Sequence, residues 1–73
     1  MEKHIFTFGS AHPFWNKYVV IEAKLAEQAR EEMFRCFGNA WSMQYTSKEF
    51  EQAKSEGFFR NLESLPTIRC GSN

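Results

Sequence analysis

The chain has 73 residues, of which 42% are hydrophobic and 25% are charged. This length is enough for one small hydrophobic core, and the composition is far from that of a disordered chain. Nine Lys and Arg residues balance nine Asp and Glu residues, so neither a nonspecific coat for nucleic acid nor a strongly acidic DNA mimic is expected. Since no apolar run approaches the roughly 18 residues of a membrane span, and the start does not resemble a signal peptide, we expect a single soluble, intracellular domain over residues 1–73.

The first part of the chain predicts a β-hairpin with a long loop. His4–Phe8 and Lys17–Ala23 are rich in β-branched and aromatic residues, which favour strands. The loop between them carries His12, Phe14 and Trp15. We expect His12 either to order the loop through a hydrogen bond or to contribute to binding. The two rings that follow it are expected at the rim of the domain.

A helix is predicted over Lys24–Phe37, with Gly38 as its C-terminal signal. Its apolar stripe, which would cover one face of a small sheet, consists of Ala26, Ala29, Met33 and Phe37. Phe34 lies on the flank of this stripe, where it covers the edge of the sheet or contacts a partner. Cys36, beside the stripe, is expected to be buried as a small hydrophobic residue.

The residues after this helix predict a third strand and a second, shorter helix. Trp41–Tyr45 alternates between large apolar and polar residues, so Trp41, Met43 and Tyr45 should share the face that meets the first helix. Thr46 and Glu49 have the spacing of a capping box, which opens a helix that ends at Gly57.

The last segment, Phe58–Leu65, predicts an edge strand that ends at Pro66, and a flexible tail is expected from about residue 66. The elements together predict an α+β fold in the order β-β-α-β-α-(β). In this fold a small antiparallel or mixed sheet of three to four strands is covered by one main helix. The pattern leaves the strand order open, although a right-handed crossover would make the third strand parallel to the second if the two are neighbours.

Aromatic residues make up 16% of the chain: eight Phe, two Trp and two Tyr. A domain this small buries only about 60% of the surface that its unfolded chain exposes. Several rings are therefore expected at the surface, where aromatic side chains contribute most to binding in protein interfaces. The alternative is that the rings fill a small core that has no disulfide or metal to support it.

The sequence contains no pattern that identifies an enzyme. Walker, Rossmann, HExxH, GxSxG and CxxC motifs are absent from it. His4 is expected to be a half-buried strand residue, and the carboxylates concentrate on the two predicted helices, as solvated faces do. Cys36 and Cys70 are expected to remain thiols, and their spacing to His4 and His12 fits no zinc site. We predict no catalytic residue, no metal and no cofactor.

The chain resembles a family of small accessory proteins encoded by phages and prophages. The shared pattern, FTFG…YVVIEA…AR..M…FG..W..QY, falls within residues 5 to 60 and is carried by Phe6–Gly9, Tyr18–Ala23, Ala29-Arg30, Met33, Phe37-Gly38, Trp41 and Gln44-Tyr45. Small proteins of this kind include anti-CRISPR inhibitors. The resemblance therefore implies a phage origin, the cytoplasm of the bacterial host as the location, and an anti-defence role. It carries over no catalytic residue, and the aromatic stretch at residues 12 to 15 departs from the pattern.

The main hypothesis is a non-enzymatic inhibitor that binds a host protein, a Cas effector, and blocks it sterically. Its predicted partner-binding residues are His12, Phe14, Trp15, Phe34, Phe58 and Phe59. One alternative is a nucleic-acid-binding accessory protein that stacks bases on Phe6 and Phe8, although the basic residues are too few and too scattered for a groove. A second alternative is a structural or assembly protein that forms a homo-oligomer through its sheet edge. The sequence leaves the oligomeric state open.

Overall fold

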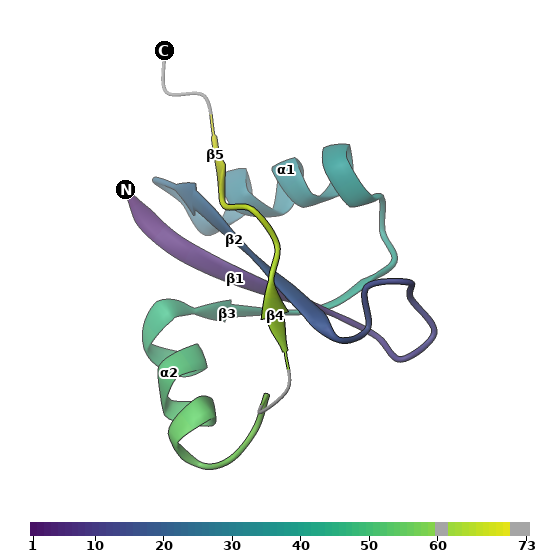
Figure 1. Cartoon of the computed structure of the whole chain (residues 1–73). Helices are drawn as coiled ribbons and strands as arrows, with labels where there is room; N and C mark the ends of the chain where they lie inside the picture. The colour runs from purple at the N-terminus through teal and green to yellow at the C-terminus, as the bar shows by residue number, and fades with distance from the viewer. Residues whose placement is uncertain (60–61, 71–73) are drawn as a thin grey trace.

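The computed structural model describes residues 1–59 and 62–70. In chain order the elements are β1 (Glu2–Phe8), β2 (Lys17–Ala23), α1 (Ala26–Phe37), β3 (Trp41–Thr46), α2 (Ser47–Ser55), β4 (Glu63–Ser64) and β5 (Ile68–Arg69) (Figure 1). The predicted α+β class and the order of its elements are confirmed. The structure adds a second short strand at the C-terminal end.

The described strands form one mixed sheet in the order β3-β1-β2-β4, and β5 also pairs with β2. The central strand β1 is antiparallel to both of its neighbours, whereas β4 and β5 are parallel to β2. β2 and β3 therefore run in the same direction with β1 between them. The chain crosses from β2 through α1 to β3, so the third strand is parallel to the second without being its neighbour.

The C-terminal segment forms less of an edge strand than the sequence predicted, and forms it further along the chain. Within Phe58–Leu65 only Glu63–Ser64 is a strand, and residues 60–61 lie outside the described residues. Ile68–Arg69, expected to belong to a flexible tail, pairs instead with β2. Pro66 separates the two short strands because it has no backbone N–H to donate to a ladder.

Ion pairs join both short strands to β2. Lys17 Nζ lies 3.4 Å from Glu63 Oε2 at one end of β2, and Arg69 Nε lies 3.1 Å from Glu22 Oε1 near the other end. Such exposed pairs contribute about 0–1 kcal/mol each. They fix the register of the segment more than they stabilise the domain.

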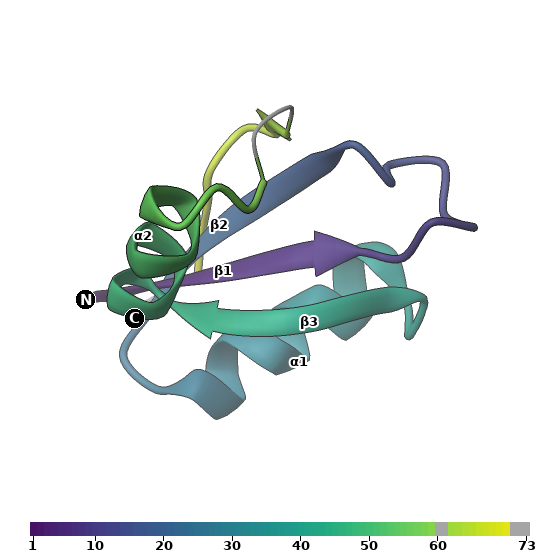
Figure 2. The same ribbon diagram turned by 90° about the horizontal axis from the view of Figure 1, so that it is seen from below.

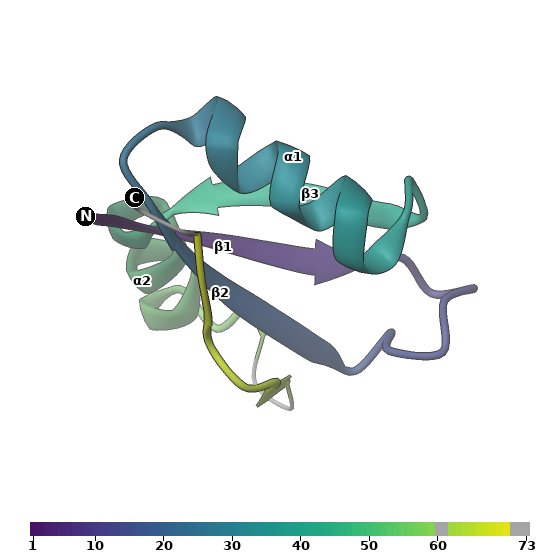
Figure 3. The same cartoon turned by 90° about the horizontal axis from the view of Figure 1, so that it is seen from above.

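The two helices lie on opposite faces of the sheet (Figures 2 and 3). The α1 face holds the main core, which consists of Phe6, Phe8, Val19, Ile21, Ala23, Ala29 and Met33. These are alternate residues of β1 and β2 together with the apolar stripe of α1, as the period of each element requires. On the other face, Phe50 of α2 is buried and packs against Tyr18 and Tyr45 at ring-centroid distances of 4.8 and 6.3 Å.

The prediction that Trp41, Met43 and Tyr45 lie on the α1 face is confirmed for Trp41 and wrong for Met43 and Tyr45. The register of β1 and β3 shifts between Thr7 and Phe8, so that Thr7 pairs with Met43 while Phe8 pairs with Trp41. This β-bulge adds one residue to β3, and an added residue reverses the alternation of faces. Trp41 consequently packs on the core, whereas Met43 and Tyr45 turn to the α2 face.

The ends of the helices follow local rules. Gly38 has φ +69° and donates its N–H to Phe34 O (3.0 Å), which ends α1 as predicted. The predicted capping box of α2 is confirmed: Glu49 N–H donates to Thr46 Oγ1 (3.1 Å), and Glu49 Oε1 accepts from Thr46 N–H (2.9 Å). The start of α1 at Ala26, rather than Lys24, agrees with the extended backbone at Leu25.

The structure corrects two predictions about burial, those for Cys36 and His4. Cys36 is exposed, because its position on α1 places the thiol over Glu32, to which it donates at 3.5 Å, and away from the sheet. His4 is buried rather than half-buried, since it lies on the α1 face of β1 between Ile21 and Thr46. Its Nε2 has no hydrogen-bond partner among the described residues.

Candidate functional site

The loop between β1 and β2 is ordered by its own hydrogen bonds. His12 N–H donates to Gly9 O (2.9 Å), Trp15 N–H donates to His12 O (3.0 Å), and Lys17 N–H donates to Phe14 O (2.8 Å). Phe14 N–H donates to Nδ1 of the His12 ring (3.0 Å). Consecutive turns of this kind leave the backbone little freedom, so the loop has one defined shape.

Ring contacts hold the same loop against the core. The His12 ring lies 4.6 Å from that of Phe8, and the Phe14 ring lies 5.7 Å from Phe8 and 6.1 Å from Phe37 of α1. The two Phe–Phe contacts are edge-to-face, which is a favoured geometry for aromatic pairs. His12 and Phe14 are thus the inner side chains of the loop, each partly buried.

Trp15 is the outer side chain of the loop. It is 60% exposed, although the residues immediately before it are held by hydrogen bonds and ring contacts. An exposed Trp on an ordered backbone is a common feature of protein-binding hot spots, because the ring offers a large contact area and few rotatable bonds.

Phe34 occupies the flank of α1, as expected, and is 49% exposed. Its ring lies 5.8 Å from that of Trp41, which in turn meets Phe6 edge-to-face at 5.1 Å. Phe34 therefore covers the outer side of a partly buried Trp. The C-terminal end of α1 and the hairpin loop lie at the same end of the molecule (Figure 3), and the contact between Phe14 and Phe37 joins them.

Phe58 and Phe59 belong to the opposite face, after α2. Phe59 stacks on Phe50 with ring centroids 5.0 Å apart and an interplanar angle of 14°, and it meets Tyr45 at 5.4 Å. Its backbone has φ +61°, which is unusual for a bulky residue. Phe58 is 60% exposed. One ring of this pair packs within the domain and the other faces solvent.

The six predicted binding residues thus form two groups. His12, Phe14 and Trp15 lie together in the hairpin loop, with Phe34 at the same end of the molecule, whereas Phe58 and Phe59 lie on the α2 face. The sequence pattern did not predict the exposure of Met43, which the β-bulge turns to the surface. No local signal in β3 marks that bulge, since it depends on the pairing with β1.

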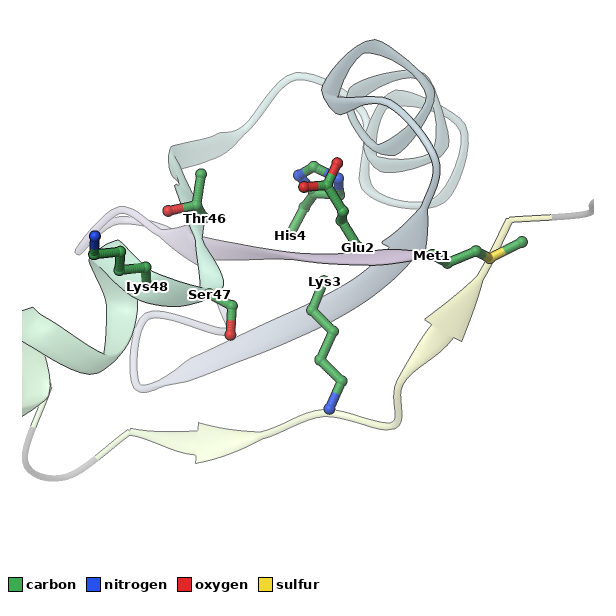
Figure 4. Close-up of a pocket in the computed structure, with 7 residues that line it drawn as sticks. All are labelled: Met1, Glu2, Lys3, His4, Thr46, Ser47 and Lys48. Carbon is green, nitrogen blue, oxygen red and sulfur yellow. The ribbon is translucent and has the colours of Figure 1, made fainter.

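A pocket of about 420 Å³ lies at the end of β1, where β1 meets the start of α2. Its lining residues are Met1, Glu2, Lys3, His4, Thr46, Ser47 and Lys48 (Figure 4). Glu2 and His4 project from one side of β1 and Lys3 from the other, so the lining wraps around the end of the sheet.

Within the described residues, the groups with a shifted pKa are Glu32, Arg35 and Cys36 on the surface of α1, and Cys70 after β5. Arg35 hydrogen-bonds Glu32 and holds the pKa of that carboxyl below its usual value. Partial burial raises the pKa of the Cys36 thiol, and the hydrogen bond to Glu32 adds to the effect. These contacts stabilise one helical turn and disfavour the thiolate form of Cys36. Among residues 1–59 and 62–70, no group of three His, Cys, Asp or Glu side chains is placed to hold a metal ion.

The sheet does not present its aromatic residues to solvent on the α1 face. Phe6 and Phe8, which the sequence analysis named as a platform for stacking bases, are buried beneath α1.

Neither helix of the described chain is long and apolar enough to cross a membrane. No protein-family model, curated protein or solved structure matches this chain.

Proposed function

We propose that this protein is a non-enzymatic inhibitor of a host defence system, an anti-CRISPR protein that binds a Cas effector and blocks it sterically. The observation that supports the proposal is the exposed Trp15 on a loop ordered by hydrogen bonds and ring contacts. The partner would contact the end of the molecule formed by the hairpin loop and the C-terminal part of α1.

The size of the contribution from Trp15 follows from its exposure. A Trp side chain offers on the order of 200 Å² of surface, and 60% of it is exposed, so a partner would bury on the order of 120 Å². At about 25 cal/mol per Å², that burial contributes about 3 kcal/mol, or roughly a hundredfold in the dissociation constant. Phe34, less exposed, would contribute a smaller amount from the adjacent surface.

The order of the loop contributes separately. A binding loop that must be ordered on association loses conformational entropy, about 0.5–1.5 kcal/mol for each immobilised side chain. In this hairpin the contacts of His12 and Phe14 fix the backbone before binding. The partner therefore meets a preorganised surface, which favours a slow dissociation rate.

The test is binding of purified protein to Cas effector complexes by biolayer interferometry, together with inhibition of target cleavage. Trp15→Ala should weaken binding by roughly a hundredfold and relieve inhibition to the same extent. The matched control is Leu25→Ala, because Leu25 is equally exposed at 59% and lies at the opposite end of β2. Failure to bind any Cas effector would refute the proposed partner. Equal effects of the two substitutions would refute the proposed surface.

A further inference from the structure

The edge strand β3 (Trp41–Thr46) has an unpaired outer side. In the sheet order β3-β1-β2-β4 its neighbour is β1, whereas β4 and β5 cover the far edge beside β2. Within the described chain no strand pairs with the outer side of β3. Its outward backbone N–H and C=O groups therefore form a template for another strand.

β3 also lacks the features that usually prevent edge pairing. Its sequence, WSMQYT, contains no charged residue and no proline. The one irregularity, the β-bulge, lies at the Trp41 end, and Met43–Thr46 keep regular register with β1. Met43 lies in this regular part of β3 and is 51% exposed.

We propose that β3 pairs antiparallel with β3 of a second copy of this chain, so that two domains share one continuous sheet. A two-fold axis makes such an interface self-complementary, because the outer side of β3 in one copy pairs with the same surface of the other copy. When the α1 faces of both copies lie on the same side of the joined sheet, odd-numbered residues of one β3 lie opposite odd-numbered residues of the other, and even-numbered residues lie opposite even-numbered ones. Centred on Gln44, it uses the regular part of β3 and sets Met43 opposite Tyr45 of the second copy. The surface differs from the hairpin loop, so the inference does not rest on the proposed inhibitory function.

The charges beside β3 fit this arrangement. The outer flank of α1 carries a helical stripe of Glu27, Arg30, Glu31 and Phe34, all exposed. Since α1 packs on both β2 and β3, its axis lies near β1, and the two copies of α1 would lie roughly 14 Å apart, or three strand spacings. This exceeds the 8–10 Å of direct helix packing, but long side chains span it. Arg30 Nε donates to Gln44 Oε1 (3.2 Å), so the two-fold axis at Gln44 brings the Arg30 side chains of the two copies near each other. Glu27 and Glu31 of each copy lie one turn before and one residue after Arg30 on the same stripe, and these carboxylates balance the two arginines.

The two-fold dimer is tested by analytical ultracentrifugation of the full chain over a range of concentrations. We expect a reversible monomer–dimer equilibrium, with Met43→Lys raising the dimer dissociation constant by about tenfold or more. Each lysine would replace the apolar partner of Tyr45, and the two lysines would lie on a diagonal across the new pair. Trp15→Lys is the matched control, since Trp15 is at least as exposed but lies on the hairpin loop, and it should leave the dimer intact. A monomer at every concentration, or a dimer that Met43→Lys does not weaken, would overturn the inference.

A charge exchange separates strand pairing from nonspecific association and guards against a folding defect. Met43→Lys and Met43→Glu should each dimerise more weakly than the parent chain, and an equimolar mixture should form a heterodimer, because the two side chains lie on a diagonal across the pair. Amide hydrogen exchange at Met43–Thr46 should slow on dimer formation. A mixture that stays monomeric although both variants fold, or protection confined to other strands, would contradict pairing through β3.

Discussion

The stability of the hairpin loop provides the most direct test of the site. Phe14→Ala removes a half-buried ring from Phe8 and Phe37. A fully buried Phe costs about 3–5 kcal/mol on truncation, so a half-buried one should cost about 2 kcal/mol. His12→Ala removes the acceptor of the Phe14 N–H and a ring contact with Phe8, which should also cost about 2 kcal/mol.

Urea denaturation followed by circular dichroism measures these changes, and in a domain of this size 2 kcal/mol corresponds to about 8–16 °C in Tm. The His12 and Phe14 rings lie 5.4 Å apart, so a double-mutant cycle should give a coupling energy of about 0.5–1.5 kcal/mol. Trp15→Ala, in the same loop, should change stability by less than about 0.5 kcal/mol because the residue is exposed. If all three variants lose equally little, the loop is not held as described, and the argument for a preorganised Trp15 fails.

Three further changes test other parts of the structure. In urea denaturation Phe59→Gly should be about 1 kcal/mol more stable than Phe59→Ala, because φ +61° is strained for any residue with a Cβ. Equal stabilities of the two variants would contradict the positive φ at this position. Thr46→Ala should cost about 1 kcal/mol by the same assay, since it removes the acceptor of the Glu49 N–H; no loss would mean that the cap does not stabilise α2. Desolvation raises the pKa of the Cys36 and Cys70 thiols, and Glu32 nearby adds to the effect. Less thiolate therefore exists at pH 8, so alkylation by iodoacetamide should be slower than for free cysteine and its rate should keep rising to higher pH; rates equal to free cysteine would contradict the raised pKa values.

The sequence predicted those elements whose signals are local. The β-branched run in β2, the stripe of α1 with Gly38 after it, and the capping box at Thr46 depend on residues within a few positions of one another. Each appears in the structure close to its predicted bounds. Such signals determine which segments form helices and strands, and hence the α+β class.

The missed features depend on pairing between distant segments. The bulge in β3 exists only relative to β1, and it turns Met43 and Tyr45 away from α1 while Trp41 stays on the core. Likewise Ile68–Arg69 is too short to be recognised as a strand until β2 is available to pair with it. The candidate site shows the same division, since the aromatic loop could be read from the sequence, whereas the separation of its residues from Phe58 and Phe59 could not.

The exposed rings are distinguished from the core by what each contributes to folding. Phe6 and Met33 are fully buried, and truncating such residues costs about 2–5 kcal/mol, a large share of the stability of a small domain. Trp15, Phe34 and Phe58 are each about half exposed or more, so much of their surface contributes nothing to the fold. An exposed ring of that size favours association. The hydrogen bonds of the hairpin loop hold the backbone of Trp15 in one conformation, so its ring is presented at one defined position. Folding therefore explains only in part why this chain contains twelve aromatic residues, and the proposed contact with another molecule would account for Trp15, Phe34 and Phe58, which remain exposed.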